Sequence, residues 1–228
     1  QLVEAETALQ SLEKMVDGNY WLSKIFVSGS PVNRARAKNL AKWAETAQLI
    51  CSDISEDLEK NIQLPPGASA DAELLSAVKR KADGNRPFLL PFGSARAREF
   101  LDRITLGGRT PSGMHQWREI RDFVEKLQNL EDLTNSWNDE ERQADGEPHE
   151  FRWPDSVDFL IEKSEEVLVL NNFGTSRLPS LEINLRTIFV AFDELGDWIM
   201  GASARQNIIE SIRMHKKLNS LKEVSRLR

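Results

Sequence analysis

The sequence is poor in cysteine, and it has no long hydrophobic run. Its one cysteine, Cys51, excludes a disulfide within the chain. Asn-x-Ser/Thr acceptor sites for glycosylation are also absent. No apolar run approaches the roughly 20 residues that span a bilayer, and no basic-then-apolar segment resembles a signal peptide. These absences predict a cytoplasmic protein without a membrane segment.

The motifs of common enzymes are missing as well. There is no phosphate-binding G-x-x-x-x-G-K-Ser/Thr loop, no G-x-G-x-x-G and no H-E-x-x-H pair. The three histidines, His115, His149 and His215, are far apart in the sequence and do not have metal-ligand spacing. The acidic pairs Glu140–Glu141 and Glu165–Glu166 lie in polar surroundings, where solvated surface is expected rather than acid/base catalysis. We therefore expect no catalytic site, metal or cofactor in this chain.

The residues that are present favour a helical core. Six tryptophans and ten phenylalanines supply enough bulk for a packed interior. Twelve glycines and nine prolines are few for 228 residues and lie between apolar runs, which favours helices over a many-turned β fold. The net charge of −6 argues against a general nucleic-acid coat protein, which would be basic.

Apolar spacing predicts an all-α fold with about seven or eight helices and no internal repeat. The acidic segment 138–150 is predicted to be a mobile loop, and 88–92 a buried segment held by prolines. Asn171–Gly174 is predicted to end a helix. The predicted helices cover residues 2–27, 31–62, 70–82, 95–104, 113–137, 154–170 and 181–228, the last with a kink near residue 200.

The two terminal segments complement each other in charge. Gln1–Asp17 has four acids and one base, a net charge of −3, whereas Arg205–Arg228 has seven bases and two acids, a net charge of +5. Each segment also has an apolar pattern that still runs at its end of the chain: Leu2, Ala5, Leu9, Leu12 and Val16 in one, and Ile208, Ile212, Leu218 and Leu221 in the other.

We therefore expect an excised or inserted segment in which the N- and C-terminal helices form an antiparallel coiled-coil stalk. The stalk would comprise residues 1–27 and 180–228, and residues 28–179 would form a helical head. Three alternatives remain open at this point. The two helices pack separately on one globule, the basic helix contacts a phosphate backbone, or the helices of two copies associate.

Six residues are candidates for contacts with a partner protein or nucleic acid. Solvated helix faces and core positions are the competing interpretation for all of them, since charged residues usually face solvent and Trp usually packs in cores. Trp153 stands out because it follows the acidic segment. The candidates are Arg96, Arg98, Arg213, Lys216, Lys217 and Trp153.

The stretch Phe88–Val124, LLPFGSARAREFLDRITLGGRTPSGMHQWREIRDFV from Leu89 on, has a distinctive order of features. An apolar Pro-Phe segment leads to a short helix, a Gly-Gly-Arg-x-Pro turn and a helix carrying Trp117. In this order it resembles the helical region inside large bacterial superfamily 1 helicase-like ATPases. The resemblance implies a helical insert that regulates or extends a nucleic-acid-dependent ATPase located elsewhere in the parent protein. No ATP-binding motif of such motors is present, so no functional residue is carried over.

These observations lead to one main hypothesis and two alternatives. The main hypothesis is a non-catalytic helical insertion module that couples a host ATPase to a partner or to nucleic acid. Its partners would be the host ATPase domains or another protein, with nucleic acid reached through the parent protein and no membrane contact. The first alternative is a stand-alone helical interaction scaffold or sensor. The second is a small helical enzyme with a site that the sequence does not reveal.

Overall fold

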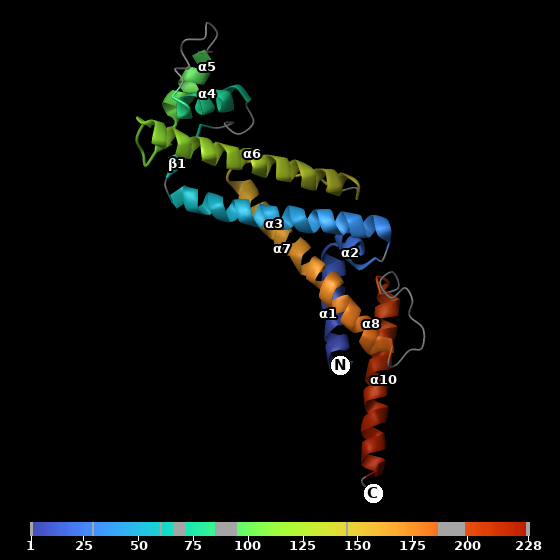
Figure 1. Cartoon of the computed structure of the whole chain (residues 1–228). Coiled ribbons are helices and arrows are strands. Elements are labelled where there is room, and N and C mark those ends of the chain that lie inside the picture. The colour runs from blue at the N-terminus through green and yellow to red at the C-terminus, as the bar shows by residue number, and fades with distance from the viewer. Residues whose placement is uncertain are drawn as a thin grey trace. The chain divides into compact units, whose positions relative to one another are not determined.

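The computed structural model confirms the all-α prediction (Figure 1). It describes residues 2–28, 30–59, 61–65, 72–84, 95–144, 146–186 and 199–226. The helices are α1 (Leu2–Gly18), α2 (Tyr20–Val27), α3 (Pro31–Glu59), α4 (Ala72–Ala82), α5 (Ala95–Arg103), α6 (Met114–Arg142), α7 (Asp155–Asn172), η2 (Phe173–Arg177), α8 (Leu178–Arg186) and α10 (Ala202–Arg226). The predicted segment 88–92 lies outside the described residues.

Two very short strands are the only extended elements in the described ranges. β1 (Ile62–Gln63) pairs antiparallel with β2 (Thr105–Leu106), with Ile62 opposite Leu106. The turn after β2 contains Gly107 and Gly108, whose φ angles of 59° and 72° favour glycine. The predicted turn is therefore confirmed, and it connects α5 to α6.

The contacts between residues divide the chain into two units, with boundaries inside α3 and α7. We call Gln1–Ala44 with Lys163–Arg228 the terminal unit, and Glu45–Glu162 the central unit. The division into a stalk and a head made from the sequence stays a prediction.

In the terminal unit, α1 packs against α2, α8 and α10. Asn19 separates α1 from α2 because its side chain accepts a hydrogen bond from the Leu22 N–H at 3.2 Å, which caps α2. The Ser23 hydroxyl, fully buried, donates to the Met15 carbonyl at 3.1 Å. These bonds fix the change of direction between the first two helices.

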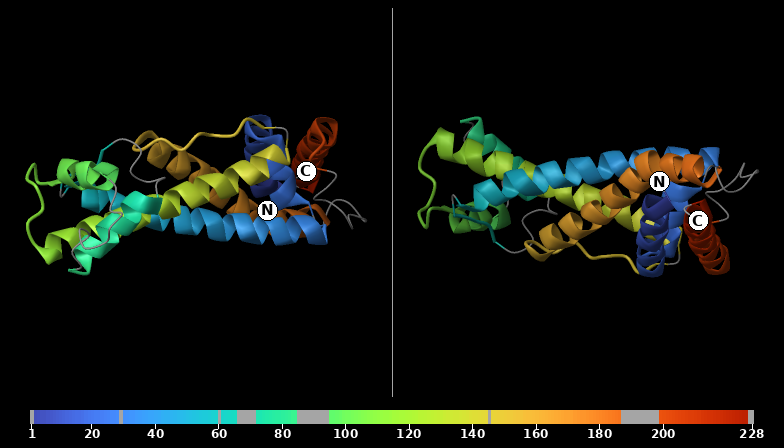
Figure 2. Two further views of the ribbon diagram at one scale, coloured as in Figure 1. Left: turned by 90° about the horizontal axis from the view of Figure 1, so that it is seen from above. Right: turned by 90° about the horizontal axis from the view of Figure 1, so that it is seen from below.

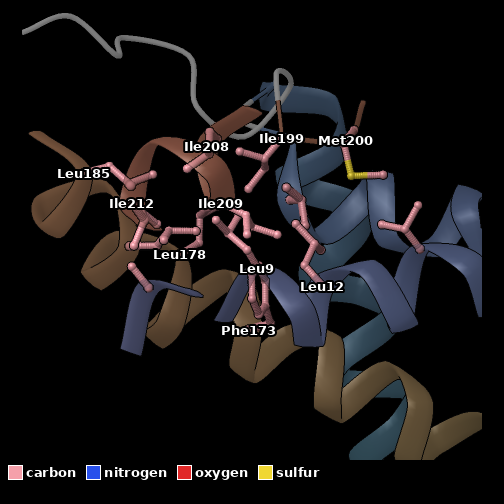
Figure 3. Close-up of a cluster of buried hydrophobic side chains, with 14 residues drawn as sticks. Leu9, Leu12, Phe173, Leu178, Leu185, Ile199, Met200, Ile208, Ile209 and Ile212 are labelled. Carbon is pink, nitrogen blue, oxygen red and sulfur yellow. The ribbon is translucent and has the colours of Figure 1, made fainter. Parts of the chain in front are cut away.

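A cluster of buried apolar residues forms a large part of the core of the terminal unit (Figure 3). Leu9 and Leu12 of α1 meet Ile208, Ile209 and Ile212 of α10, and all five are at most 3% exposed. Further residues from α1, α2, η2, α8 and the turn before α10 complete it: Ala5, Val16, Val27, Phe173, Leu178, Leu181, Leu185, Ile199 and Met200.

The predicted helix end at Asn171–Gly174 is wrong, because the helix continues from α7 through η2 into α8. The Leu178 N–H donates to the carbonyl of Phe173, five residues earlier, so this turn is wider than an α-helical turn. At Gly174 the backbone comes so close to the Phe26 carbonyl oxygen that a Cβ would collide with it. Glycine thus serves close packing here instead of ending a helix.

In the central unit, α4 packs against α5 and α6. Lys126 of α6 donates to the buried Asp57 carboxylate of α3 at 2.7 Å. Phe123 of α6 meets Trp153 edge-on, with ring centroids 5.5 Å apart.

The prediction of a loop over 138–150 is wrong in its first part, since α6 extends to Arg142. Asn138 is 5% exposed, and its amide forms two hydrogen bonds of 2.8 Å with the backbone N–H and C=O of His149. This reciprocal pairing ties the segment back to α6. Asn138 and His149 are eleven residues apart in the sequence, and apolar periodicity does not reveal a contact of this kind.

Candidate functional site

The helix α10 in the terminal unit has two different faces, one buried and one exposed. Figures 1 and 2 show α10 beside α1, and Figure 1 shows that the two helices run in opposite directions. The inner face of α10 carries Ile208, Ile209 and Ile212, which are buried against α1 and its neighbours. Their burial and the helix directions agree with the predicted antiparallel packing. A coiled-coil geometry is not established by these contacts.

A three-residue ion cluster closes the edge of this packing. The Glu6 carboxylate of α1 accepts hydrogen bonds from Arg213 Nε at 2.9 Å and Lys216 Nζ at 2.7 Å. The Glu6 side chain is 18% exposed, whereas those of Arg213 and Lys216 are 56% and 32% exposed. The hydrogen bonds from Lys216 and Arg213 hold the pKa of the Glu6 carboxyl below its ordinary value, because they stabilise the charged form. Two of the predicted contact residues therefore bind within the chain.

A third basic residue of α10 is buried. Arg205 is 2% exposed, and its Nη1 donates to the carbonyls of Ile199 and Met200 at 3.0 and 2.7 Å. Its Nε has no hydrogen-bond partner among the residues the structure describes. Arg205 thus fastens the turn before α10 to the first turn of this helix. The sequence showed Arg205 only as one of the seven bases of residues 205–228, because the carbonyls that it binds leave no sequence pattern.

The outer face of α10 is apolar at its centre and exposed. Met214, Leu218 and Leu221 are 66%, 54% and 57% exposed. The interpretation of Ile208, Ile212, Leu218 and Leu221 as one continuous apolar pattern is therefore wrong, because the first two are buried and the last two are exposed. Ile212 and Leu218 are six residues apart, or about 120° around an α-helix, so they face different directions. We call Met214, Leu218 and Leu221 the outer seam.

Lys217, another predicted contact residue, is exposed beside the outer seam. Lys222 is exposed on the other side of it. The ten residues Arg213–Lys222 contain four bases and no acid. The outer seam is therefore an apolar strip within a locally positive segment.

The remaining predicted contact residues lie in the central unit and do not gather at one place. Arg96 and Arg98 are exposed on α5, and each takes part in an interaction. Trp153 is half-buried through its edge-on contact with Phe123. The structure thus brings together Arg213 and Lys216, with Lys217 on the same helix.

A cavity of about 530 Å³ lies in the terminal unit between α1 and the η2–α8 segment. Its lining includes Val3, Thr7, Ser176, Arg177 and Ser180. The hydroxyls of Thr7 and Ser180 donate to carbonyls four residues earlier in their own helices, at 3.0 and 3.1 Å. Their protons are thus engaged within the helices, and these hydroxyls present acceptor lone pairs to the cavity. The lining thus combines apolar residues, hydroxyl acceptors and the exposed Arg177, and this mixture does not define a class of ligand.

The histidines have separate structural surroundings. His149 stacks on Phe159 with centroids 3.9 Å apart, and its Nε2 lies 3.2 Å from Ser156 Oγ. Ser156 is fully buried and accepts a bond from the Arg152 N–H at 2.7 Å, so its hydroxyl holds the start of α7 and is shielded from substrate. His115 is exposed beside Glu119. In the described ranges, no three His, Cys, Asp or Glu residues gather in a way that could hold a metal.

Cys51 is buried at 1% exposure on α3. Burial raises the pKa of its thiol to about 11, with a smaller contribution from the charge of Asp158. At neutral pH the thiol is therefore protonated and unreactive. None of the described helices combines the length and the apolar character that crossing a bilayer requires.

Comparison with known proteins gives no relative. No protein-family model, curated protein or solved structure matches this chain.

Proposed function

We propose that this chain is a non-catalytic helical module that couples a larger, nucleic-acid-dependent ATPase in the cytoplasm to a partner. The observation that supports a recognition role is the division of α10 into a buried inner face and an apolar, exposed outer seam. An exposed apolar strip rimmed by charged residues is typical of a protein interaction site. A helix of this kind stabilises its own unit and contacts another protein at the same time.

The packing of α1 on α10 also suits a module carried within a larger protein. The Glu6 cluster ties the first turns of α1 to the middle of α10, and the two helices run in opposite directions (Figure 1). Segments adjoining the start of α1 and the end of α10 would therefore leave the terminal unit on the same side. Displacement of either helix would be transmitted to the shared apolar cluster, which is a physical route for coupling.

The ATPase part of the proposal depends on the resemblance of Phe88–Val124. Residues 95–124 of that stretch form α5, β2 with its glycine turn, and the first part of α6. These residues carry no nucleotide-binding motif. ATP hydrolysis is accordingly assigned to the host protein.

A stand-alone helical interaction scaffold is the competing function, and it would use the same face of α10. The two functions differ in the identity of the protein that surrounds or contacts the chain. Lysine-directed crosslinking in cells that express the protein naturally, followed by mass spectrometry, distinguishes them. We expect crosslinks from several lysines to a region that carries ATPase motor motifs, in the same or another polypeptide. Crosslinks confined to proteins without such motifs would contradict the ATPase part and favour the scaffold.

A second measurement tests the absence of catalysis. The purified chain is assayed for ATP hydrolysis with and without single-stranded and duplex DNA. We expect no turnover above that of a mock purification. Turnover that persists through purification would overturn the non-catalytic proposal.

A further inference from the structure

The outer seam has the spacing of a helix-pairing surface. Met214, Leu218 and Leu221 follow one another at intervals of four and three residues, which are the d, a and d positions of a heptad. Around an α-helix they lie roughly 120–180° away from Ile212, the centre of the buried face. The α1 helix therefore does not use this seam, and the exposure of its three residues shows that it is open.

The charges that flank Leu218 and Leu221 in the outer seam are of one sign. With Leu218 at position a, Lys217 takes position g and Lys222 takes position e. These two positions flank the seam and set the choice of partner in paired helices. Both lysines are exposed, and no acid lies between Arg213 and Lys222.

We propose that the outer seam docks an acidic amphipathic helix of another protein region, with apolar residues at its a and d positions and Glu or Asp at e and g. The inner side of α10 gives a precedent, since Glu6 of the acidic helix α1 binds Arg213 and Lys216 there. Acidic e and g positions would meet Lys217 and Lys222 in either a parallel or an antiparallel orientation. This inference deepens the proposed function by giving the chemistry of the recognised partner.

Other occupants fit the outer seam less well. A second copy of α10 would place Lys217 and Lys222 against the same lysines, and like charges at these positions destabilise a pair. Nucleic acid would gain nothing from three apolar side chains at the centre of the surface. A lipid surface favours a wide apolar face with aromatic residues, whereas the outer seam is narrow and has none.

The test is a titration of the full chain with a labelled synthetic helix of three heptads, Leu at a and d and Glu at e and g, followed by fluorescence anisotropy. We expect binding that weakens with added salt. Leu218→Glu should weaken it at least about tenfold, because it removes an apolar contact and adds a like charge to the acidic peptide. The matched control is Ile183→Glu, since Ile183 is 67% exposed on α8 and lies outside the seam. This control should bind the peptide as the wild type does.

Charge reversal gives an independent test that does not alter the apolar residues. The double variant K217E/K222E should lose affinity for the acidic peptide and gain affinity for the same peptide with Lys at e and g. Equal effects of Leu218→Glu and Ile183→Glu, or equal binding of acidic and basic peptides by the wild type, would overturn the proposal. Sedimentation that shows a dimer abolished by Leu218→Glu would assign the seam to a second copy. Duplex DNA or anionic vesicles that bind wild type but not Leu218→Glu, with no peptide binding, would assign it to those surfaces.

The outcome is separable from that of the proposed function. Seam-dependent peptide binding without crosslinks to a motor region would retain the docking surface and remove the ATPase host. Crosslinks to a motor region, together with peptide binding that does not depend on the outer seam, would retain the ATPase host and remove the docking surface.

Discussion

Truncating one apolar residue on each face of α10 should have very different effects on stability. Ile212 is fully buried in the cluster with α1, whereas Leu218, six residues later, is 54% exposed. Ile212→Ala removes buried methyl and methylene groups and leaves a cavity, which costs about 2–5 kcal/mol of unfolding free energy. Leu218→Ala removes a side chain that already contacts water over half of its surface.

The expected cost at position 218 follows from this exposure. Full burial of a leucine side chain is worth roughly 1.5–3 kcal/mol, and Leu218 obtains at most about half of that. Alanine keeps the Cβ contacts and is the better helix former, which reduces the loss further. We therefore expect Leu218→Ala to cost less than about 0.7 kcal/mol.

Urea unfolding followed by far-UV circular dichroism measures both variants. The midpoint should fall strongly for Ile212→Ala and hardly move for Leu218→Ala, with similar m values for wild type and Leu218→Ala. Equal losses at the two positions would refute the assignment of opposite faces. So would a larger loss at position 218.

Three other features of the structure can be probed by substitution or by chemical reaction. Because its basic partners lower the folded-state pKa of Glu6, their contribution to stability is present above its ordinary pKa of 4.5 and is lost as the pH falls through the folded value. Glu6→Gln should therefore cost about 0.5–1 kcal/mol at neutral pH, and a gap that stays constant down to pH 2 would contradict this. Gly174→Ala should lower the free energy of unfolding by about 1–3 kcal/mol, because the new Cβ would collide with the Phe26 carbonyl. Gly18→Ala, where a Cβ would meet open space, should be neutral or stabilising by up to about 1 kcal/mol. Thermal denaturation of both variants measures the difference. The buried thiol of Cys51, whose pKa is raised to about 11, should react with a disulfide reagent at pH 8 only as the chain unfolds; a rate equal to that of a free thiol would refute its burial.

The sequence predicted the helical class because apolar periodicity and turn residues act locally. The turn at Gly107–Gly108 was visible in the sequence as a break between two apolar helical patterns. The complementary charges of the terminal segments also indicated that α1 and α10 pack together, as the Glu6 cluster confirms.

The errors arise where a residue has a distant partner or serves two purposes. Gly174 was interpreted as a helix end, but its lack of a side chain permits close approach to Phe26. Asn138 was assigned to a loop, but its amide pairs with the backbone of His149. Neither partner can be inferred from local spacing.

The two faces of α10 were within reach of the sequence. Ile208 and Ile212 are four residues apart and share a face, but the step of six to Leu218 does not return to it. A strict angular count would have separated the outer seam. The count alone could not show which of the two faces is covered, because that depends on α1.

One face of α10 packs on α1, and the opposite face is open to an acidic helix. Cysteine scanning tests this arrangement most directly. Single cysteines are placed along α10 at buried and exposed positions in a Cys51→Ala background, and their rates of reaction with a thiol reagent are measured. We predict slow reaction at 208, 209 and 212 and fast reaction at 214, 218 and 221. The acidic peptide should slow only the second group. Slow reaction at 218 and 221 without peptide, or peptide protection that spreads equally over both faces, would contradict the two-face arrangement.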